Sequence, residues 1–360
     1  MTDSQITEAA IDLLRALIST PSFSGEEGDT AVLIEDFLKA AGHAPQRLHN
    51  NVWAASSNHA PGAPVLLLNS HHDTVRPAKD WQGDPFAPVQ EGDKLTGLGS
   101  NDAGASAVAL LASFVILARV PELPVKLIVA ITAEEENSGP KGIASLLPQL
   151  GPIDAGIVGE PTGMEMAVAE KGLVVIDCTA HGKGGHAARD EGENALYKAV
   201  RDIQRIQDLH FEKVSDLLGP VKLSVTQIEA GSQHNVVPAA CSFVIDVRTN
   251  EHYSNAVVVE TLQDLLESEV KARSLRLNSS GIASDHPLVR AGAALGRGSY
   301  GSPTLSDQAQ MPFNTLKMGP GESARSHTAG EYILLSEIKE AIGLYTQLIT
   351  SLPGDKKDYQ

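Results

Sequence analysis

The feature that most constrains the fold is a series of short apolar runs, each ending directly at polar or charged residues. The clearest runs are Val65–Leu68, Val125–Ile131 and Ala155–Val158. Segments between them have helical spacing, above all the Ala- and Leu-rich stretch Asp102–Arg119. Continuous apolar runs of this length are typical of strands buried on both faces, and their alternation with helices favours a parallel sheet. The sequence therefore predicts an α/β fold, with a three-layer domain built on a mainly parallel sheet.

The middle of the chain has a different pattern, with strands that alternate with two long amphipathic helices. The expected order is β-α-β-β-α-β, which is the arrangement of a ferredoxin-like α+β unit. Its expected elements are strands at 173–180, 221–228, 241–247 and 275–277, and helices at 194–209 and 256–272. We therefore expect a small domain at 171–280, inserted into a discontinuous catalytic domain made of 1–170 and 281–360. The last residues, GDKKDYQ, are expected to form a disordered polar tail.

Composition excludes several classes of protein. The formal net charge of the 360 residues is -17, which argues against nucleic acid or an anionic membrane as a partner. The apolar runs are too short to cross a membrane, and the start MTDSQITEAA lacks the features of a signal peptide. Only two cysteines occur, Cys178 and Cys241, so a disulfide scaffold is not expected and a reducing cytoplasm is the expected location.

Polar residues that suit a metal site follow the predicted strands. Taken alone, each residue could have an ordinary structural role instead of binding metal. His71 could be a loop histidine bonded to backbone, and Asp102 could cap a helix. Taken together, the set offers nitrogen and oxygen ligands without thiolate, which suits Zn²⁺, with Co²⁺ or Mn²⁺ as substitutes. Because ligands bind at the carboxyl ends of parallel strands, we expect the residues to meet there. They are His71, Asp73, Asp102, the triplet Glu134–Glu136, Glu160 and His327.

Longer motifs give a family resemblance that covers nearly the whole chain. These motifs are SHHDTV, WQGDPF, GLGSNDAGA, TAEEENSGPKG, GEPT, EKG, GKGGHAA, NVVPAACSFVIDVR, LSDQ, MGPGESARSH and GEYI. With them the chain resembles the co-catalytic di-zinc aminoacylase/carboxypeptidase metallopeptidase family, which includes acetylornithine deacetylase, succinyl-diaminopimelate desuccinylase and glutamate carboxypeptidase. The C-terminal motifs look most like the acetylornithine deacetylase branch.

The resemblance implies a role for each metal-site residue. His71 is expected to be a terminal ligand of one zinc, oriented by Asp73. Asp102 is expected to bridge the two metals. Glu160 is expected to complete the first site, and His327 the second, together with one glutamate of the triplet. His72 is the neighbouring alternative to His71, but the His-x-Asp spacing of the family selects His71.

The register of the glutamate triplet has two solutions. The family has Asp-Glu-Glu where this chain has three glutamates, and a glycine six residues after the ligand. Gly142 lies six residues after Glu136, which makes Glu135 the general base and Glu136 the ligand. A slip of one residue would instead make Glu134 the base and Glu135 the ligand.

The resemblance also assigns roles in the inserted domain. His186 is expected to stabilise the oxyanion, and in dimeric relatives this histidine comes from the partner subunit, which implies a homodimer through the inserted domain. Arg248 is expected to hold a substrate carboxylate, because a planar guanidinium suits bidentate binding, and Asn235 is expected to bind substrate nearby. Weaker candidates for the site are Lys171, Asp307 and Arg325.

These expectations combine into one function. The chain is expected to use a zinc-activated water to remove an acetyl or succinyl group from an amino acid such as ornithine, citrulline or lysine, in arginine or lysine biosynthesis. The alternatives are a dipeptidase or carboxypeptidase of the same family, or succinyl-diaminopimelate desuccinylase. An alternative from another class of function is a protein that binds metal but has lost catalysis. The presence of Glu135, the expected general base, argues against this alternative.

Overall fold

The computed structural model describes residues 1–359, and it divides into two compact units. The first unit consists of Met1–Val168, Ile282–Tyr300 and Ser306–Gln360, and the second of Ala169–Gly281 and Gly301–Leu305. Each unit has its own buried apolar core.

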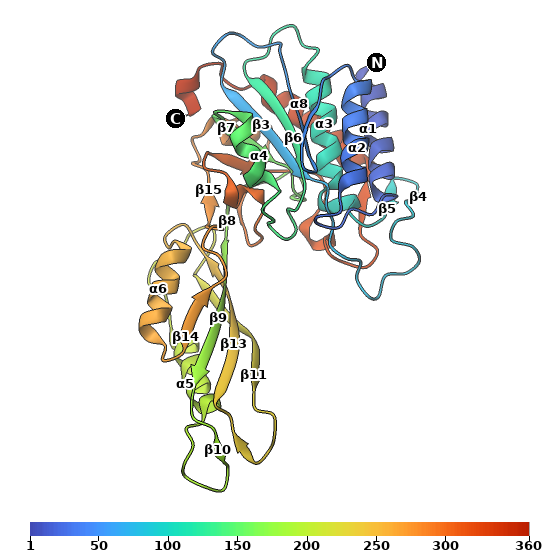
Figure 1. Ribbon diagram of the computed structural model, residues 1–360. Helices are drawn as coiled ribbons and strands as arrows, with labels where there is room; N and C mark the ends of the chain where they lie inside the picture. Colours follow the sequence, from blue (N-terminus) through green and yellow to red (C-terminus); the bar gives the residue numbers. More distant parts are fainter. Residues whose placement is uncertain (360) are drawn as a thin grey trace. The chain divides into compact units, whose positions relative to one another are not determined.

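A mainly parallel sheet forms the centre of the first unit (Figure 1). Its middle is the parallel order β6-β3-β7-β17, and β1 and β2 continue it antiparallel beside β6. The strands of this sheet are β1 (Gln46–Leu48), β2 (Asn51–Ala55), β3 (Val65–His71), β6 (Lys126–Thr132), β7 (Ala155–Val158), β17 (Thr315–Lys317) and β8 (Met166–Glu170). Two further strands pair with β8, namely β15 (Ser280–Gly281) and β16 (Ser299–Ser302). A separate ribbon contains β4 (Val89–Glu91), β5 (Lys94–Thr96) and β18 (Tyr332–Leu334).

Helices cover both faces of this sheet, which confirms the predicted three layers. Alternate residues of each central strand face opposite sides, so Leu66 and Leu68 pack under one helical layer and Leu67 under the other. The larger layer contains α1 (Asp3–Ile18), α2 (Gly28–Ala40), α3 (Ala105–Leu117) and α8 (Leu335–Thr350), and the opposite face carries α4 (Ile143–Leu150) (Figure 1). The remaining helical segments of this unit are η1 (Ser100–Gly104), α7 (Pro287–Ala294), η2 (Asp307–Gln310), η3 (Ser323–Arg325) and η4 (Lys356–Tyr359).

One helical window is long and apolar enough to cross a membrane by composition alone. The window Ser100–Leu117 has a mean hydropathy of 1.5, and 89% of it is buried within the structure. Its residues on α3 pack against α1, α8 and the sheet, so this segment is the central helix of the core.

The second unit has the predicted ferredoxin-like α+β architecture. Its four antiparallel strands have the order β11-β13-β9-β14. The sheet places alternate residues of β9 and β13, such as Ile176 and Phe243, in one core with both helices. The elements are β9 (Gly172–His181), β10 (Gly185–His186), α5 (Ala195–Asp208), β11 (Lys222–Ala230), β12 (Val236–Val237), β13 (Ala240–Thr249), α6 (Asn255–Leu265) and β14 (Glu269–Ala272).

Three predictions about local structure are wrong. The helix expected at 256–272 ends at Leu265, and the last strand is Glu269–Ala272 rather than 275–277. The buried carboxylate of Asp202 accepts hydrogen bonds from the backbone N–H groups of Glu267 and Ser268, which fixes the turn between helix and strand. The tail expected to be disordered forms η4, and Tyr359 is only 4% exposed within the core of the first unit; Gln360 lies outside the described residues.

Candidate metal centre

The carboxyl ends of three parallel strands bring the predicted ligands together. His71 is the last residue of β3, and its register partner on β6 is Thr132, so the glutamate triplet begins beside it. Glu160 follows the end of β7, which pairs with the other edge of β3. Parallel strands end at the same edge of a sheet, and this explains why residues far apart in the sequence meet here.

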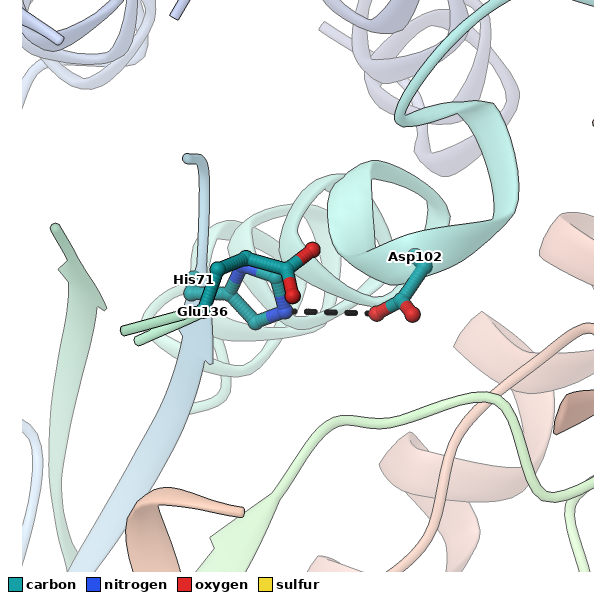
Figure 2. Close-up of side chains that lie close together, drawn as sticks. All are labelled: His71, Asp102 and Glu136. Atoms are coloured by element: carbon teal, nitrogen blue, oxygen red, sulfur yellow. Dashed lines mark ion pairs between the residues drawn. The ribbon is translucent and has the colours of Figure 1, made fainter. Parts of the chain in front are cut away.

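His71 is the buried centre of the cluster, with 1% of its side chain exposed. Its Nδ1 lies 3.0 Å from the carbonyl oxygen of Asp73 and 3.3 Å from the Asp73 carboxylate. The other ring nitrogen, Nε2, lies 3.3 Å from Asp102 Oδ1, an ion pair that Figure 2 marks with a dashed line. The same Nε2 lies 3.8 Å and 3.9 Å from carboxylate oxygens of Glu135 and Glu160. This Nε2 makes no hydrogen bond, so a buried ligand atom faces three carboxylates.

Asp102 lies between the two histidines. Its Oδ1 faces His71, and its Oδ2 lies 3.4 Å from Nε2 of His327. The same Nε2 of His327 lies 3.1 Å from Oε2 of Glu136. One carboxylate oxygen for each histidine is the geometry that a bridging ligand requires.

The donor set fits divalent cations. Ligand atoms of His71, Asp102 and Glu136 lie within 4.8 Å of one another, and so do those of His71, Glu135 and Glu160. Oxygen and imidazole ligands, without thiolate, are those of catalytic zinc sites, and an Asp73–His71 contact is the usual support for a zinc-bound imidazole. The unpartnered Nε2 of His71 is the observation that best fits a bound metal.

The protein without metal concentrates charge at this cluster. Burial alone would lower the pKa of His71, but Glu135, Asp102 and Asp73 raise it well above its usual value. Burial raises the pKa of Glu160 to about 8, and Asp102 adds to the rise. A hydrogen bond to Glu136 raises the pKa of His327 to about 9, against the opposing effect of burial. Protons therefore partly neutralise the site in the place of cations.

Burial also raises the pKa of Glu135 well above its usual value, and Glu160, Asp307 and Glu136 increase the shift, while His71 opposes it. A raised pKa makes Glu135 a stronger proton acceptor than an ordinary carboxylate, which suits a general base. The pKa of Asp102 is lowered in spite of burial, because the nearby imidazoles of His71 and His327 favour its charged form.

Glu134 points away from the cluster. Its φ is +55°, and its Oε2 accepts a hydrogen bond from the backbone N–H of Lys141 at 2.9 Å. Its two neighbours, Glu135 and Glu136, carry the carboxylates that face His71 and His327. The structure thus has the arrangement expected for the register with Glu135 as base and Glu136 as ligand, although the roles themselves stay predictions.

His72 also lies outside the cluster. Its Nδ1 lies 2.8 Å from Thr30 Oγ1, and its Nε2 lies 3.0 Å from the carbonyl oxygen of Asn50. Burial lowers its pKa. Both ring nitrogens are occupied, so of the two adjacent histidines only His71 is available as a ligand.

The predicted substrate residues His186, Asn235 and Arg248 belong to the second unit. His186 pairs with Val236 in the β10–β12 ribbon, and the carbonyl of Asn235 accepts the N–H of Ala187 at 3.0 Å, so Asn235 lies close to His186, directly before β12. Arg248 lies on β13, where its guanidinium donates to both carboxylate oxygens of Asp246 at 2.8 Å and 3.2 Å. The roles of all three remain predictions.

The weaker candidates have defined environments. Asp307 is buried and accepts a hydrogen bond from Thr132 Oγ1 at 2.9 Å. Arg325 makes a bidentate ion pair with Glu337, at 2.7 Å and 3.0 Å, which indicates a structural role beside His327. Lys171 belongs to the second unit, where its Nζ donates to the carbonyl of Pro220.

Two buried glutamates support the ligand loops and were not assigned from the sequence. Oε1 of Glu331 accepts the N–H groups of Asn101 and Asp102, and its Oε2 accepts that of Gly99. The motif GEYI contains Glu331, so the motif match was the only signal. Glu27 is 0% exposed, and nothing in the segment SGEE distinguishes it from its neighbour.

Comparisons with known proteins find matches in two family models and in named relatives. The family model described as peptidase dimerisation domain matches residues 168–274, and the model of peptidase family M28 matches residues 51–205. A succinyl-diaminopimelate desuccinylase of Xylella fastidiosa (strain M12) is 28% identical over 374 residues, covering 95% of this chain and 98% of the relative.

Solved structures share the fold over nearly the whole chain. Aminopeptidase PepT from Bacillus cereus ATCC 10987 has a TM-score of 0.78 at 19% identity, covering 96% of this chain and 98% of that chain. The Bacillus subtilis YXEP protein, a dinuclear metal binding peptidase from the M20 family, has a TM-score of 0.75 at 18% identity, covering 97% and 98%. A metal-ligand cluster at the carboxyl edge of a parallel sheet is joined in one chain to a segment that matches a peptidase dimerisation domain. The chain is similar over nearly its whole length to succinyl-diaminopimelate desuccinylases and to M20 metallopeptidases, and it is a hydrolase of amide bonds.

Proposed function

We propose that this protein is a di-zinc hydrolase that removes an acyl group from the amino group of an amino acid, with succinyl as the preferred acyl group. The observation that carries the proposal is Asp102, which offers one carboxylate oxygen to each of His71 and His327. His71, Asp102 and Glu160 would hold one cation, and Asp102, Glu136 and His327 the other. Co²⁺ or Mn²⁺ could substitute for Zn²⁺.

Bound cations would supply positive charge that acidifies a water molecule and polarises the amide carbonyl. Glu135 would accept the proton of the attacking water and return it to the leaving amine, which its position beside His71 and Glu160 and its raised pKa support. Asp73 would hold the His71 ring through Nδ1 and leave Nε2 free for metal. His186 is proposed to donate to the oxyanion.

A cluster of cations in the second unit supports an anionic substrate. Lys222 on β11 is the register partner of Arg248 on β13. Burial lowers the pKa of Lys171, and the positive charges of Lys222 and Arg248 lower it further, so the three cations lie near one another. In a chain of net charge -17, such a cluster favours a ligand with carboxylates. Arg248 is proposed to bind one of them, and Asn235 to contact the substrate nearby.

The substrate of first choice is therefore N-succinyl-diaminopimelate, a compound that carries three carboxylates. The named desuccinylase relatives support this choice, and with it a place in lysine biosynthesis. Acetylated or succinylated ornithine, citrulline and lysine form the second candidate group, which the C-terminal motifs LSDQ and MGPGESARSH favour. The match to a peptidase dimerisation domain supports a homodimer, and a cytoplasmic location follows from the proposed reaction.

The test is a substrate panel with the zinc-loaded protein. It compares succinyl-diaminopimelate with acetyl- and succinyl-ornithine, -citrulline and -lysine and with dipeptides. We expect the highest kcat/KM for succinyl-diaminopimelate. A preference for an acetylated amino acid would select the second group of substrates. Turnover of dipeptides alone would contradict the proposed removal of an acetyl or succinyl group.

A further inference from the structure

Three successive backbone amides of the glutamate triplet point at buried carboxylates. The N–H of Glu134 donates to Oε1 of Glu27 at 3.1 Å. The N–H groups of Glu135 and Glu136 donate to the two carboxylate oxygens of Asp73, at 3.0 Å and 3.1 Å. The backbone is therefore held by charged acceptors on one side while Glu135 and Glu136 direct their side chains to the metal cluster.

Glu27 lies in a fully satisfied and fully buried environment. Its Oε1 also accepts the N–H of Gly25 at 2.6 Å, and its Oε2 accepts Nδ2 of Asn50 at 2.8 Å. The orientation of Asn50 is fixed in turn, because its Oδ1 accepts Nη2 of Arg47 at 2.9 Å. Each oxygen of Glu27 thus has a defined donor, and the amide of Glu134 is one of them.

Packing alone does not hold the triplet at this point. A cavity of about 180 Å³ adjoins the contact, lined by Gly25, His49, Asn50, Ala133, Glu134 and Lys141. Glu134 has a φ of +55°, a left-handed conformation that residues with a side chain adopt only when the surroundings impose it. With space beside it and an unfavourable backbone conformation, the loop depends on hydrogen bonds for its position.

We propose that Glu27 is a positioning residue for the general base Glu135 and the ligand Glu136, and that it acts through the backbone amide of Glu134. The assignment rests on the proposed function, because it takes Glu135 as the base. Support of this kind, one contact removed from the ligands, typically changes metal affinity or activity about 10–100-fold when it is lost.

The variant Glu27→Gln tests the proposal. Its side-chain oxygen can still accept the amides of Gly25 and Glu134, but its NH₂ group would face Nδ2 of Asn50, donor against donor. Asn50 cannot reverse its amide without losing Arg47. The double variant Glu27→Gln/Asn50→Asp exchanges the polarity of this contact and restores an acceptor for both neighbours. Glu26→Gln is the matched control, because Glu26 is exposed and its side chain makes no hydrogen bond or ion pair among the described residues.

We expect kcat of Glu27→Gln to fall about 10–100-fold with KM changed less than about threefold, while Glu26→Gln keeps wild-type values. The absorption spectrum of the Co²⁺-loaded protein should change in Glu27→Gln only, and hydrogen exchange of the segment 132–142 should become faster. The double variant should recover kcat to within about threefold of wild type.

Glu27→Gln with the kcat, spectrum and exchange of Glu26→Gln would overturn the proposal, and so would a double variant as impaired as the single one. If Glu27→Gln fails to fold, the double variant decides alone: it must fold and be active. Hydrogen exchange separates this proposal from the proposed function, because it reports the anchoring of the triplet even in a protein that hydrolyses none of the tested substrates.

Discussion

Glu135→Gln is the substitution whose effect the site geometry defines most closely. The side chain of Glu135 is 11% exposed, and its Oε2 lies 3.8 Å from Nε2 of His71. Glutamine has nearly the same volume, and the backbone N–H that donates to Asp73 is unchanged, so the fold should be kept. The substitution removes only the ability to take and return a proton.

Loss of a general base typically lowers kcat about 10²–10⁴-fold, which corresponds to about 2.7–5.4 kcal/mol in activation free energy at 1.36 kcal/mol per tenfold. The assay is the initial rate of hydrolysis of the best panel substrate, with metal content measured on the same sample by emission spectrometry. Two metals per chain should remain bound, because Glu136 and not Glu135 is the proposed ligand.

Glu134→Gln is the matched control for this prediction. Its side-chain oxygen can still accept the N–H of Lys141, and it faces away from His71, so kcat should change less than about threefold. A fully active Glu135→Gln protein with both metals, or a Glu134→Gln protein that loses activity in its place, would refute the assigned register.

Three further predictions concern stability. In the metal-free protein, the raised pKa values of Glu160 (about 8) and His327 (about 9) mean that the folded state binds these protons more tightly than the unfolded state. Stability to urea should therefore fall as pH rises from 7 to 9, and zinc should bind more tightly over the same range. A stability that rises with pH would contradict the raised pKa values of both residues. Tyr359→Ala should lower the free energy of unfolding by about 2–4 kcal/mol in urea titrations, because Tyr359 is buried against His286; an unchanged midpoint would show that the C-terminal segment is not docked. Asp202→Asn should destabilise the second unit by about 2–3 kcal/mol, measured by urea unfolding, since this buried carboxylate accepts two backbone N–H groups; a loss below about 0.5 kcal/mol would contradict that role.

Much of the fold and of the metal cluster could be predicted because both depend on local patterns. The apolar run that became β3 ends at His71, and the run that became β6 ends beside Glu134. The rule that parallel strands end at one edge of a sheet then brings these residues together without further information. The helix at 102–119 could also be predicted from the spacing of neighbouring residues, although the regular helix begins only at Ala105. The N-cap position of this helix is Gly104, so Asp102 is not the simple helix cap that its position suggested.

The features that could not be predicted depend on contacts between distant segments. Glu27 and Glu26 are identical in type and adjacent, and contacts with distant residues distinguish them, among them the hydrogen bond from the Glu134 amide, 107 residues away. The end of α6 at Leu265 is set by Asp202 on another helix, where the sequence pattern alone would continue. Tyr359 lies in a polar segment without periodicity, yet its ring finds His286 and a place in the core.

The most direct test of the central claim is a crystal structure of the zinc-loaded protein with anomalous diffraction data at the zinc edge. The account predicts two zinc peaks bridged by Asp102, one bound by His71 and Glu160 and the other by Glu136 and His327. A single peak, or a zinc ion bound by Glu134 or Glu135 in place of Glu136, would contradict it.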